Sequence, residues 1–368
     1  MSIRVATVFS GIGAPEEALR QLGVKHSIVF ACDNGERYLE KTAEELILAY
    51  KSAKKKDKSL TISRFIEKEY EKTGKINYIK RSYFANHTIN QDSWYEDVRF
   101  LDGRPYRNQV DLFIGGSPCQ SFSTYGKKKG LEDARGTLFY DYARLVKEIR
   151  PKVFIYENVR GLLTHDDGKT WEVIKEVFDS LAYDLKYEVL DAQDYNLPQM
   201  RKRIFAVGIR RDIPHEEFVF PEKVQLTHVA TEYLNEYVPK QDYLGEKGFR
   251  WVTETVRNDG KARVNRDVIG CQTAIQQINW SGDFRVEIPR KEHYDDPNIY
   301  IGQYDGHDAV ARKLMPDECV RLMGFENFNI VNEDRIMYRQ AGNSIAVPVM
   351  KALINRIAEF IQLDEEEE

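Results

Sequence analysis

Residues 4–23 read RVATVFSGIGAPEEALRQLG. The β-branched run 4–9 is typical of a buried strand, and Gly11 and Gly13 supply a tight turn after it. Residues 16–22 then have the apolar spacing of a helix, which Gly23 ends. A strand, a glycine turn and a helix in this order predict the opening unit of an α/β fold.

The same alternation continues along the chain. Further strands are predicted at 27–32, 110–114, 153–156, 186–191 and 203–208, and helices near 36–50, 138–149, 171–181, 316–323 and 347–361. Strands that alternate with helices usually form a parallel sheet, because each helix crosses over the sheet between two strands. We therefore expect a doubly wound, mainly parallel α/β sheet with helices on both faces.

A smaller domain interrupts this pattern. From about residue 221 to 308 the chain breaks into short β-like pieces rich in Gly, Asn and aromatic residues. We expect a large domain formed by 1–220 and 333–368, and a smaller domain with its hinge at 221–332. The segment 51–81 is a basic insertion with eleven Lys or Arg against four Asp or Glu, and its residues Ile62, Phe65, Ile66 and Tyr70 share one helical face. The sequence leaves open whether this insertion binds phosphate groups or only covers the sheet.

Composition argues against several classes of protein. The 368 residues contain no apolar run long enough to span a membrane, and the chain begins with a strand rather than a signal peptide, so we expect a cytoplasmic protein. The four cysteines are scattered without a Cys-x-x-Cys pair, which argues against a disulfide framework or a zinc site, and no metal is expected. A net charge of −5 argues mildly against nucleic acid, but the clustering of Lys and Arg matters more.

The glycine turn and a following acid indicate a nucleotide site. Phe9, Gly11, Ile12 and Gly13 join the first strand to its helix, where a ligand can approach the backbone closely. An ordinary turn has the same glycines, and the third glycine of a dinucleotide fingerprint is absent. Asp33 ends the next strand, about twenty residues on, and can accept hydrogen bonds from both ribose hydroxyls. Together these residues predict an adenosine-type ligand.

Cys119 is the candidate nucleophile. It follows the apolar strand 110–114 in the loop Gly115-Gly116-Ser117-Pro118-Cys119, at the strand end where α/β sheets build their sites. Most cysteines are buried and inert. This loop, however, continues to three lysines at 127–129 and to Arg135, and a positive environment favours the reactive thiolate.

Charged side chains accompany the next two strands. Glu157 ends the strand 153–156, so we expect its carboxylate beside Cys119, although an acid there could also cap a helix. Arg201 and Arg203 open the last of the strands and are expected to share one face, because they are two residues apart. A thiol, a carboxyl group and two guanidinium groups are thus predicted to meet at one edge of the sheet.

These residues, in this order, resemble the C5-cytosine DNA methyltransferases, especially the compact bacterial type of restriction-modification systems. The matching blocks are Phe9 to Gly13, Asp33, Asp97, Pro118-Cys119-Gln120, Glu157-Asn158-Val159, Gln199-x-Arg201-x-Arg203, Arg312 to Glu318 and Gln340-Ala341-Gly342-Asn343-Ser344. One such block has little specificity, but eight in the family's order, over nearly the whole chain, are very specific. The resemblance implies the S-adenosylmethionine-dependent methyltransferase fold, with a target-recognition domain at 221–332.

The resemblance also implies a reaction. Cys119 adds to carbon 6 of a cytosine flipped out of double-stranded DNA, while the Glu157 carboxyl acts on ring nitrogen 3 and Arg203 holds the carbonyl at position 2. Arg201 supports the same side. A methyl group passes from S-adenosylmethionine to carbon 5 without a metal. The base that removes the carbon 5 proton is not visible in the sequence.

Binding residues follow from the same resemblance. The cofactor residues are Phe9, Gly11, Ile12, Gly13, Asp33, Asp97, Pro118, Leu138, Asn343 and Ser344, with Asp97 at the adenine amine and Asp92 as its rival. The DNA residues are Gln120, Tyr125, Lys127 and Arg135 in a closing loop, and Arg257, Lys261 and Arg263 in the recognition domain. Tyr125 and the recognition-domain charges could also be ordinary surface residues. The resemblance implies a monomer, and the sequence leaves open whether a separate cognate restriction endonuclease exists as its partner.

Three alternatives remain open. A tRNA cytosine-5 methyltransferase of the same family shares the catalytic blocks, but this chain lacks the Cys-Phe-Thr tripeptide of that branch. A catalytically silent DNA-binding relative has no need to keep Cys119, Glu157 and Arg203. A nucleotide-dependent oxidoreductase is supported by Gly11 and Gly13 alone. The recognised DNA sequence cannot be read from the chain.

Overall fold

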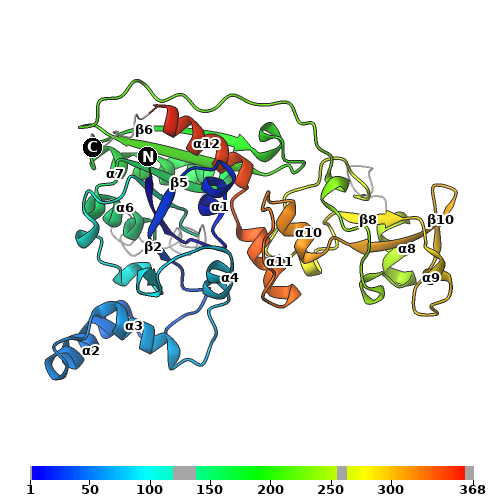
Figure 1. Cartoon of the computed structure of the whole chain (residues 1–368), viewed down its shortest axis with the longest axis horizontal. Helices are drawn as coiled ribbons and strands as arrows, with labels where there is room; N and C mark the ends of the chain where they lie inside the picture. Colours follow the sequence, from blue (N-terminus) through cyan, green and yellow to red (C-terminus); the bar gives the residue numbers. More distant parts are fainter. Residues whose placement is uncertain (1, 119–137, 255–262, 361–368) are drawn as a thin grey trace. The chain divides into compact units, whose positions relative to one another are not determined.

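The structure is a computed structural model that describes residues 2–118, 138–254 and 263–360 (Figure 1). The chain divides into two compact units. Unit 1 comprises Met1–Leu190, Lys202–Glu222 and Met350–Glu368, and unit 2 comprises Asp191–Arg201 and Lys223–Val349. The segment from Met350 therefore belongs to unit 1, and the predicted domain bounds stay a prediction.

Unit 1 is built on a seven-stranded sheet with the order β3-β2-β1-β4-β5-β7-β6. The strands are β1 (Ile3–Val8), β2 (His26–Cys32), β3 (Trp94–Tyr95), β4 (Leu112–Gly115), β5 (Val153–Val159), β6 (Tyr183–Asp191) and β7 (Lys202–Arg210). Neighbours from β3 through β5 pair in parallel, and β7 is antiparallel to β5. Strand order runs outward from β1 in both directions, which confirms the doubly wound, mainly parallel sheet.

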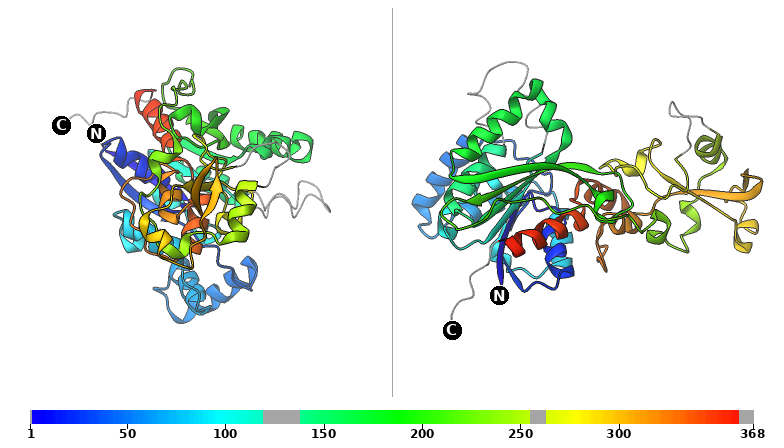
Figure 2. Two further views of the ribbon diagram at one scale, coloured as in Figure 1. Left: turned by 90° about the vertical axis from the view of Figure 1, so that its right-hand side faces the viewer. Right: turned by 90° about the horizontal axis from the view of Figure 1, so that it is seen from above.

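Helices cover both faces of this sheet. The helices of unit 1 are α1 (Ala14–Gln21), α2 (Ala43–Lys56), α3 (Ile62–Glu71), α4 (Tyr78–Asn86), α6 (Leu138–Ile149), α7 (Lys169–Asp179) and the part of α12 (Val347–Phe360) from Met350 on, and α2 and α3 project from the sheet rather than cover it (Figure 1). Figure 2 shows α6 and α7 on one face and α1 and α12 on the other. The core under α6 and α7 is strongly aromatic, with Phe113, Tyr142, Phe154 and Phe178 buried together.

The helix predicted near 36–50 begins later, at Ala43. Gly35 and Glu36 both have positive φ, which breaks the helix. Thr42 then forms a capping box with Glu45, because the Glu45 N–H donates to Thr42 Oγ1 at 3.2 Å and the Thr42 N–H donates to Glu45 Oε2 at 2.7 Å. The start of this helix is therefore set by its cap rather than by apolar spacing.

The basic insertion 51–81 is mostly helical, as predicted. It contains the end of α2, all of α3 and the start of α4. Phe65, Ile66 and Tyr70 on one face of α3 are buried, and they pack with Leu46 of α2 and with Phe100. The exposed faces carry the lysines.

Unit 2 contains a three-stranded antiparallel sheet with the order β8-β10-β9. Its strands are β8 (Phe284–Glu287), β9 (Gly302–Tyr304) and β10 (His307–Lys313), and its helices are α8 (Glu246–Glu254), α9 (Lys291–Tyr294), α10 (Pro316–Arg321), α11 (Asp334–Asn343) and the first residues of α12. α8 packs Phe249 and Val252 against the sheet. The region predicted as short β-like pieces thus also contains α8 and α9, and α11 is a helix that no sequence pattern predicted. The assignment of target recognition to 221–332 stays a prediction.

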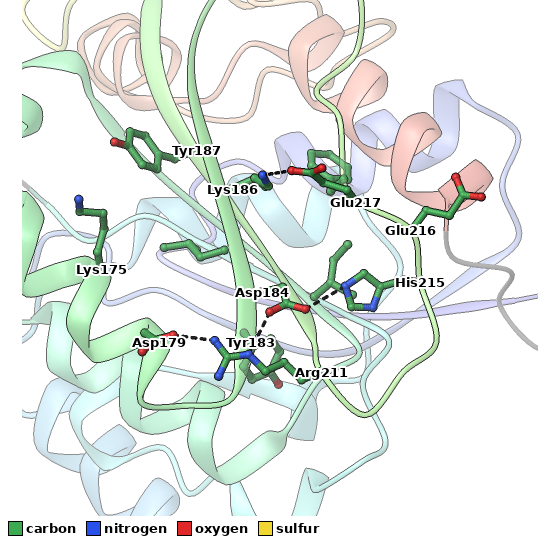
Figure 3. Close-up of a pocket in the computed structure, with 13 residues that line it drawn as sticks. Lys175, Asp179, Tyr183, Asp184, Lys186, Tyr187, Arg211, His215, Glu216 and Glu217 are labelled. Carbon is green, nitrogen blue, oxygen red and sulfur yellow. Dashed lines mark hydrogen bonds and ion pairs between the residues drawn. The ribbon is translucent and has the colours of Figure 1, made fainter.

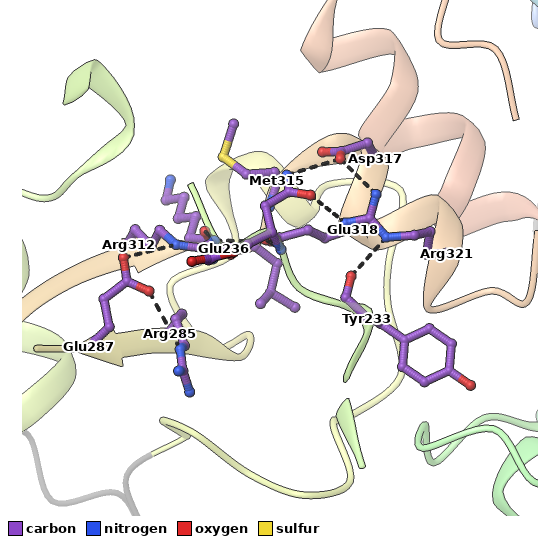
Figure 4. Close-up of polar contacts among 12 residues, drawn as sticks. Tyr233, Glu236, Arg285, Glu287, Arg312, Met315, Asp317, Glu318 and Arg321 are labelled. Atoms are coloured by element: carbon purple, nitrogen blue, oxygen red, sulfur yellow. Dashed lines mark hydrogen bonds and ion pairs between the residues drawn. The ribbon is translucent and has the colours of Figure 1, made fainter. Parts of the chain in front are cut away.

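A buried ion pair joins β10 to α10 in unit 2 (Figure 4). The Arg312 guanidinium donates to both carboxylate oxygens of Glu318, at 2.9 and 3.0 Å, and neither side chain is exposed. The Met315 N–H also donates to Glu318 Oε2, at 2.6 Å. Arg312 therefore fixes the turn between the strand and the helix.

Replacing Arg312 with leucine leaves the buried Glu318 without its bidentate donor. We expect Arg312→Leu to lower the free energy of unfolding by about 3–5 kcal/mol in urea denaturation followed by circular dichroism. Arg250→Leu is the control, because it breaks an exposed pair with Glu246 and is expected to cost less than about 1 kcal/mol. Equal losses in the two variants would contradict the structural role of the buried pair.

Candidate active site

Polar residues gather at one edge of the sheet in unit 1. β1, β4 and β5 run parallel, so their carboxyl ends lie side by side, with Val8 opposite Gly115 and Gly115 opposite Tyr156. β7 runs the other way and begins at this edge, where Arg203 lies opposite Val159. Phe9 to Gly13 follow β1, Asp33 follows β2 and Glu157 lies near the end of β5, so the fold brings these predicted site residues to the edge where Arg203 lies.

The glycine turn after β1 holds the Asp33 carboxylate. The Gly11 N–H donates to Asp33 Oδ2 at 3.0 Å, and the Gly35 N–H donates to Oδ1 at 2.8 Å. Burial raises the pKa of Asp33 to about 6, although these two backbone donors lower it. Gly11 has a φ of +54°, and a Cβ added there would meet no atom within 4 Å. A carboxylate and an accessible backbone therefore lie together at this edge.

Residues from α4 and just after it support the turn, although no sequence pattern identifies them. His87 Nε2 lies 2.9 Å from the Ile12 carbonyl oxygen, and a Cβ at Gly13 would lie 2.1 Å from the same nitrogen. The Tyr83 hydroxyl donates to Glu16 Oε1 at 2.6 Å. Gly13 is therefore required because the imidazole occupies the space that a side chain would need.

Asp97 lies at the same edge, two residues after β3. It is buried, and its carboxylate accepts hydrogen bonds from the Tyr70 hydroxyl at 2.8 Å and from Arg99 Nη2 at 2.6 Å. Asp92 is exposed and precedes β3, so it lies toward the other end of that strand. This placement favours Asp97 over Asp92 as a ligand-binding acid. The contact of Asp97 with an adenine amine stays a prediction.

The start of the Cys119 loop is fixed to β5. Ser117 Oγ lies 2.7 Å from Tyr156 Oη, and Asn158 Nδ2 donates to the Ser117 carbonyl oxygen at 3.0 Å. All three residues are buried. A Cβ at Gly116 would lie 2.6 Å from the Glu157 carbonyl oxygen and 2.9 Å from Glu157 Oε2. The chain can leave β4 this close to Glu157 only because residue 116 is glycine.

Glu157 and Arg203 form a pair across β5 and β7. Arg203 Nε lies 3.3 Å from Glu157 Oε1, and both side chains are largely buried. The register pairs Glu157 with Phe205 and Val159 with Arg203, so the two charged residues lie diagonally on the same face of the sheet. The guanidinium thus holds a carboxylate beside the residues from which the Cys119 loop leaves β4.

The sequence matches one protein family over most of its length. The family described as C-5 cytosine-specific DNA methylase matches residues 58–359. M1.ScrFI, a type II methyltransferase of Lactococcus lactis subsp. cremoris, is 34% identical over 278 residues, which are 74% of this chain and 68% of that protein. The chain belongs to the C-5 cytosine-specific DNA methylases.

Other relatives agree with this assignment. M.HhaI, a type II methyltransferase of Haemophilus parahaemolyticus, is 31% identical over 67% of this chain and 75% of its own length. M.Rho11sI, an orphan methyltransferase of Bacillus phage rho11s, is 35% identical over 86% of this chain and 65% of its own length. The structure of the Dnmt2 methyltransferase of S. pombe shares the fold, with a TM-score of 0.64, 20% identity and coverage of 97% of this chain and 98% of that one. The protein is therefore a DNA (cytosine-5-)-methyltransferase, and the family generally uses S-adenosylmethionine.

In this methyltransferase Arg201 lies outside the strand on which it was predicted. β7 begins at Lys202, and Arg201 belongs to unit 2. Its guanidinium donates to the carbonyl oxygens of Gln272, Gly342 and Ser344, at 3.0, 2.9 and 2.6 Å. The expectation that Arg201 lies on the strand with Arg203 is wrong, because its side chain instead forms hydrogen bonds with these carbonyl groups in unit 2. Its role in the reaction stays a prediction.

The remaining predicted residues divide into two groups. In the described part of the chain, Pro118 and Asn343 are exposed, Ser344 is buried in unit 2, Leu138 packs on the aromatic core, and Arg263 donates to the Ser281 carbonyl oxygen at 2.6 Å. Cys119, Gln120, Tyr125, Lys127, Arg135, Arg257 and Lys261 lie outside the described residues. Their contacts with cofactor or DNA stay predictions.

Two further properties concern the described residues only. No group of three or more His, Cys, Asp or Glu side chains among them is arranged to hold a metal ion. Of the helices in residues 2–118, 138–254 and 263–360, none is long and apolar enough to cross a membrane.

A surface pocket of about 550 Å³ opens elsewhere in unit 1 (Figure 3). Its lining includes the start of β6 and residues after the end of β7. The pocket therefore lies at the edge of the sheet opposite to the one where Arg203 lies. Arg211 pairs there with Asp179 at 2.6 Å and with Asp184 at 2.9 Å, and His215 lies 3.3 Å from Asp184. These charged groups pair with one another, and the pocket is not part of the catalytic edge.

Adding one methyl group at Gly116 tests the geometry of this edge. We expect Gly116→Ala to reduce methyl transfer to DNA by about tenfold to a hundredfold, because the Cβ would displace Glu157. Incorporation of radioactive methyl groups into DNA measures this loss. Gly161→Ala is the control, since its Cβ would meet only Val159 Cγ2, at 4.0 Å, and it is expected to remain active. Equal activity in both variants would contradict the importance of the close approach.

Proposed function

We propose that this methyltransferase modifies carbon 5 of a cytosine flipped out of a short double-stranded DNA sequence, with Cys119 as the nucleophile. The observation that carries the proposal is the Glu157–Arg203 pair beside Ser117, where the Cys119 loop begins. Cys119 follows Ser117 by two residues, and two residues of chain span at most about 7 Å. A thiol within this distance could reach a base that Glu157 and Arg203 hold.

The cysteine is needed because carbon 5 of cytosine is too electron-poor to take up a methyl group directly. Addition of the Cys119 thiolate to carbon 6 forms a C–S bond and moves the electrons of the 5,6 double bond, so that carbon 5 becomes nucleophilic. After methylation, loss of the carbon 5 proton and expulsion of the thiolate restore the ring and the free cysteine. The lysines and the arginine that follow Cys119 in the sequence favour the thiolate.

Glu157 and Arg203 stabilise the ring during this addition. Negative charge develops on the ring, and the Glu157 carboxyl offsets it by protonating or hydrogen-bonding ring nitrogen 3. Arg203 holds the carbonyl oxygen at position 2 and, through the 3.3 Å contact, keeps the Glu157 side chain in position. Arg201 acts at a distance, by ordering the segment that leads into β7.

The residues around Asp33 fit S-adenosylmethionine. When bound, this cofactor supplies a methyl group attached to a positively charged sulfur. Asp33 has acceptor capacity beyond its two backbone donors and can bind ribose hydroxyls, while the open backbone at Gly11 can lie against the ligand. The proposed cofactor residues are Phe9, Gly11, Ile12, Gly13, Asp33, Asp97, Pro118, Leu138, Asn343 and Ser344.

DNA binding is assigned to the loop after Cys119 and to residues 221–332. Extrusion of the cytosine costs a few kcal/mol, which pocket contacts and a group that fills the vacated stack can offset. Tyr125 is the proposed filling group, and Gln120, Lys127 and Arg135 accompany it in the closing loop. Arg257, Lys261 and Arg263 are the proposed contacts of the recognition domain. We expect a monomer in the cytoplasm, where its DNA substrate lies.

The biological setting is proposed from the relatives. Type II methyltransferases among them support a restriction-modification system with a separate cognate endonuclease. Orphan methyltransferases of Bacillus phages are also similar, at 35% identity, and favour the alternative of a methyltransferase without a nuclease. Unmethylated plasmid and plasmid methylated by the purified protein can be incubated with extracts of the source cells. Cleavage of the unmethylated plasmid alone would support a restriction-modification system, and cleavage of neither would support a methyltransferase without a nuclease.

Cofactor binding is expected to depend on pH through Asp33. Because its pKa is raised to about 6 in the folded protein, Asp33 keeps its proton between about pH 4 and 6, where the unfolded chain has released it. The contribution of Asp33 to the free energy of unfolding therefore falls as pH rises through this range. The carboxylate form, which accepts the ribose hydroxyls, is populated above pH about 6. Titration calorimetry should therefore show S-adenosylmethionine binding about tenfold more weakly at pH 5 than at pH 7.5. Asp33→Asn should bind weakly at both pH values, and an equal pH dependence in this variant would exclude Asp33 as its source.

Bisulfite sequencing tests the proposed reaction as a whole. Plasmid DNA from methylation-free bacteria that express the protein should show protected cytosines within one short recurring sequence. Plasmid from cells expressing Cys119→Ser should show none, because that variant lacks the thiolate. Absence of protection with the intact, folded protein would contradict the DNA reaction and redirect the search to tRNA or to a silent DNA-binding role.

A further inference from the structure

The basic insertion packs against the strand ends that carry the predicted cofactor acids. Tyr70 of α3 lies in an apolar cluster with Leu46 of α2 and with Phe100, which follows Asp97 by three residues. α3 forms one side of this cluster. Asn77 follows α3 along the chain and is the N-cap of α4. The insertion is therefore part of the wall behind the ends of β2 and β3.

Tyr70 holds the Asp97 carboxylate. The side chain is 1% exposed, and its hydroxyl donates to Asp97 Oδ2 at 2.8 Å. Burial and the nearby Asp97 charge raise the pKa of Tyr70, so the hydroxyl stays protonated and acts as a donor. Arg99 holds the same carboxylate, with Nε donating to Oδ1 at 3.0 Å and Nη2 donating to Oδ2 at 2.6 Å. Two rigid donors from different elements thus set the orientation of Asp97.

Asn77 holds the loop that carries Asp33. Its Nδ2 donates to the Asp33 carbonyl oxygen at 2.9 Å and to Glu96 Oε2 at 2.8 Å. Its Oδ1 accepts the Lys80 N–H at 2.9 Å, which caps α4. Gly35 lies directly against it, since a Cβ there would be 2.2 Å from Asn77 Oδ1. The side chain therefore connects the Asp33 loop to the insertion through one buried amide.

Arg37 adds a third connection on the same side. Its guanidinium lies 4.6 Å from the centre of the Tyr70 ring and pairs with the buried Glu96. Its Nη1 also donates to the Lys75 carbonyl oxygen at 3.2 Å. The ring of Tyr70, the Asp33 loop and the segment after α3 are thus joined in one network of buried polar groups.

We propose that the insertion is a built-in support of the cofactor site, in which Tyr70 and Asn77 are positioning residues that hold Asp97 and the Asp33 loop in the geometry that binds S-adenosylmethionine. The inference rests on the proposed function, which assigns cofactor binding to Asp33 and Asp97. It gives the insertion a role other than phosphate binding. Because neither residue touches the reacting atoms, both should affect the affinity for the cofactor rather than the rate of chemistry.

Tyr70→Phe removes one oxygen and keeps the apolar packing of the ring. We expect the KM for S-adenosylmethionine to rise about tenfold, in line with the loss of one hydrogen bond to a charged group. The KM for DNA and the kcat at saturating cofactor should change less than twofold. Tyr50→Phe, on α2 at the residue before the insertion, is the matched control, because its hydroxyl donates to the Leu60 carbonyl oxygen at 3.2 Å, away from the acids, and it should leave all three constants unchanged.

Asn77→Asp separates support of the loop from capping of α4. The aspartate keeps an acceptor for the Lys80 N–H, but it replaces the Nδ2 donor with an oxygen beside Glu96. The KM for the cofactor should rise at least as much as in Tyr70→Phe. Thermal unfolding and circular dichroism of each variant show whether the fold is retained.

Asp33→Ala distinguishes the possible failures. An unchanged cofactor KM in folded Tyr70→Phe, while Asp33→Ala raises it, would overturn the supporting role and leave the proposed function intact. An unchanged cofactor KM in Asp33→Ala as well would contradict the proposed cofactor site itself. If Tyr70→Phe lowers kcat and raises the KM for DNA as much as it raises the KM for the cofactor, Tyr70 has a general structural role, and this result would also overturn the inference.

Discussion

The close approach of β4 to its neighbours depends on two positions without side chains. A Cβ at Gly115 would lie 2.8 Å from Val8 Cγ2 and 2.9 Å from the Tyr142 ring, and one at Gly116 would lie 2.6 Å from the Glu157 carbonyl oxygen. Because both positions are glycine, the end of β4 fits between β1 and β5 and the chain turns directly over Glu157. The position of residues 116–118, where the chain leaves β4, relative to the Glu157–Arg203 pair follows from this steric constraint.

Charge is divided along the same edge of the sheet. At the ends of β2 and β3, Asp33 accepts two backbone hydrogen bonds, while Glu96 pairs with Arg37 and Asp97 pairs with Arg99. At β5 and β7, Glu157 is paired with Arg203, and the loop after Cys119 is basic in sequence, which suits DNA. A net charge of −5 for the whole chain is therefore a poor guide to its partner.

The sequence predicted the parts of the fold and site that depend on local pattern. Apolar strands followed by turns identified β1, β2, β4 and β5, and residues at the ends of β2 and β5, such as Asp33 and Glu157, could be located from strand order alone. Contacts between distant segments could not be predicted in this way. No pattern shows that His87 fills the space beside Gly13, or that Tyr70 in the insertion reaches Asp97. Arg201 was misplaced because carbonyl groups more than 70 residues away bind its guanidinium.

The most direct test of covalent catalysis at Cys119 uses DNA in which 5-fluorocytosine replaces cytosine. Fluorine at carbon 5 cannot leave as a proton, so the thiolate cannot be expelled and the enzyme should stay bound to the DNA through carbon 6. Incubation with S-adenosylmethionine should give a protein–DNA complex that resists denaturation, and mass spectrometry of its peptides should place the link at Cys119. A linked residue other than Cys119, or an equal amount of complex from Cys119→Ser, would contradict the assignment.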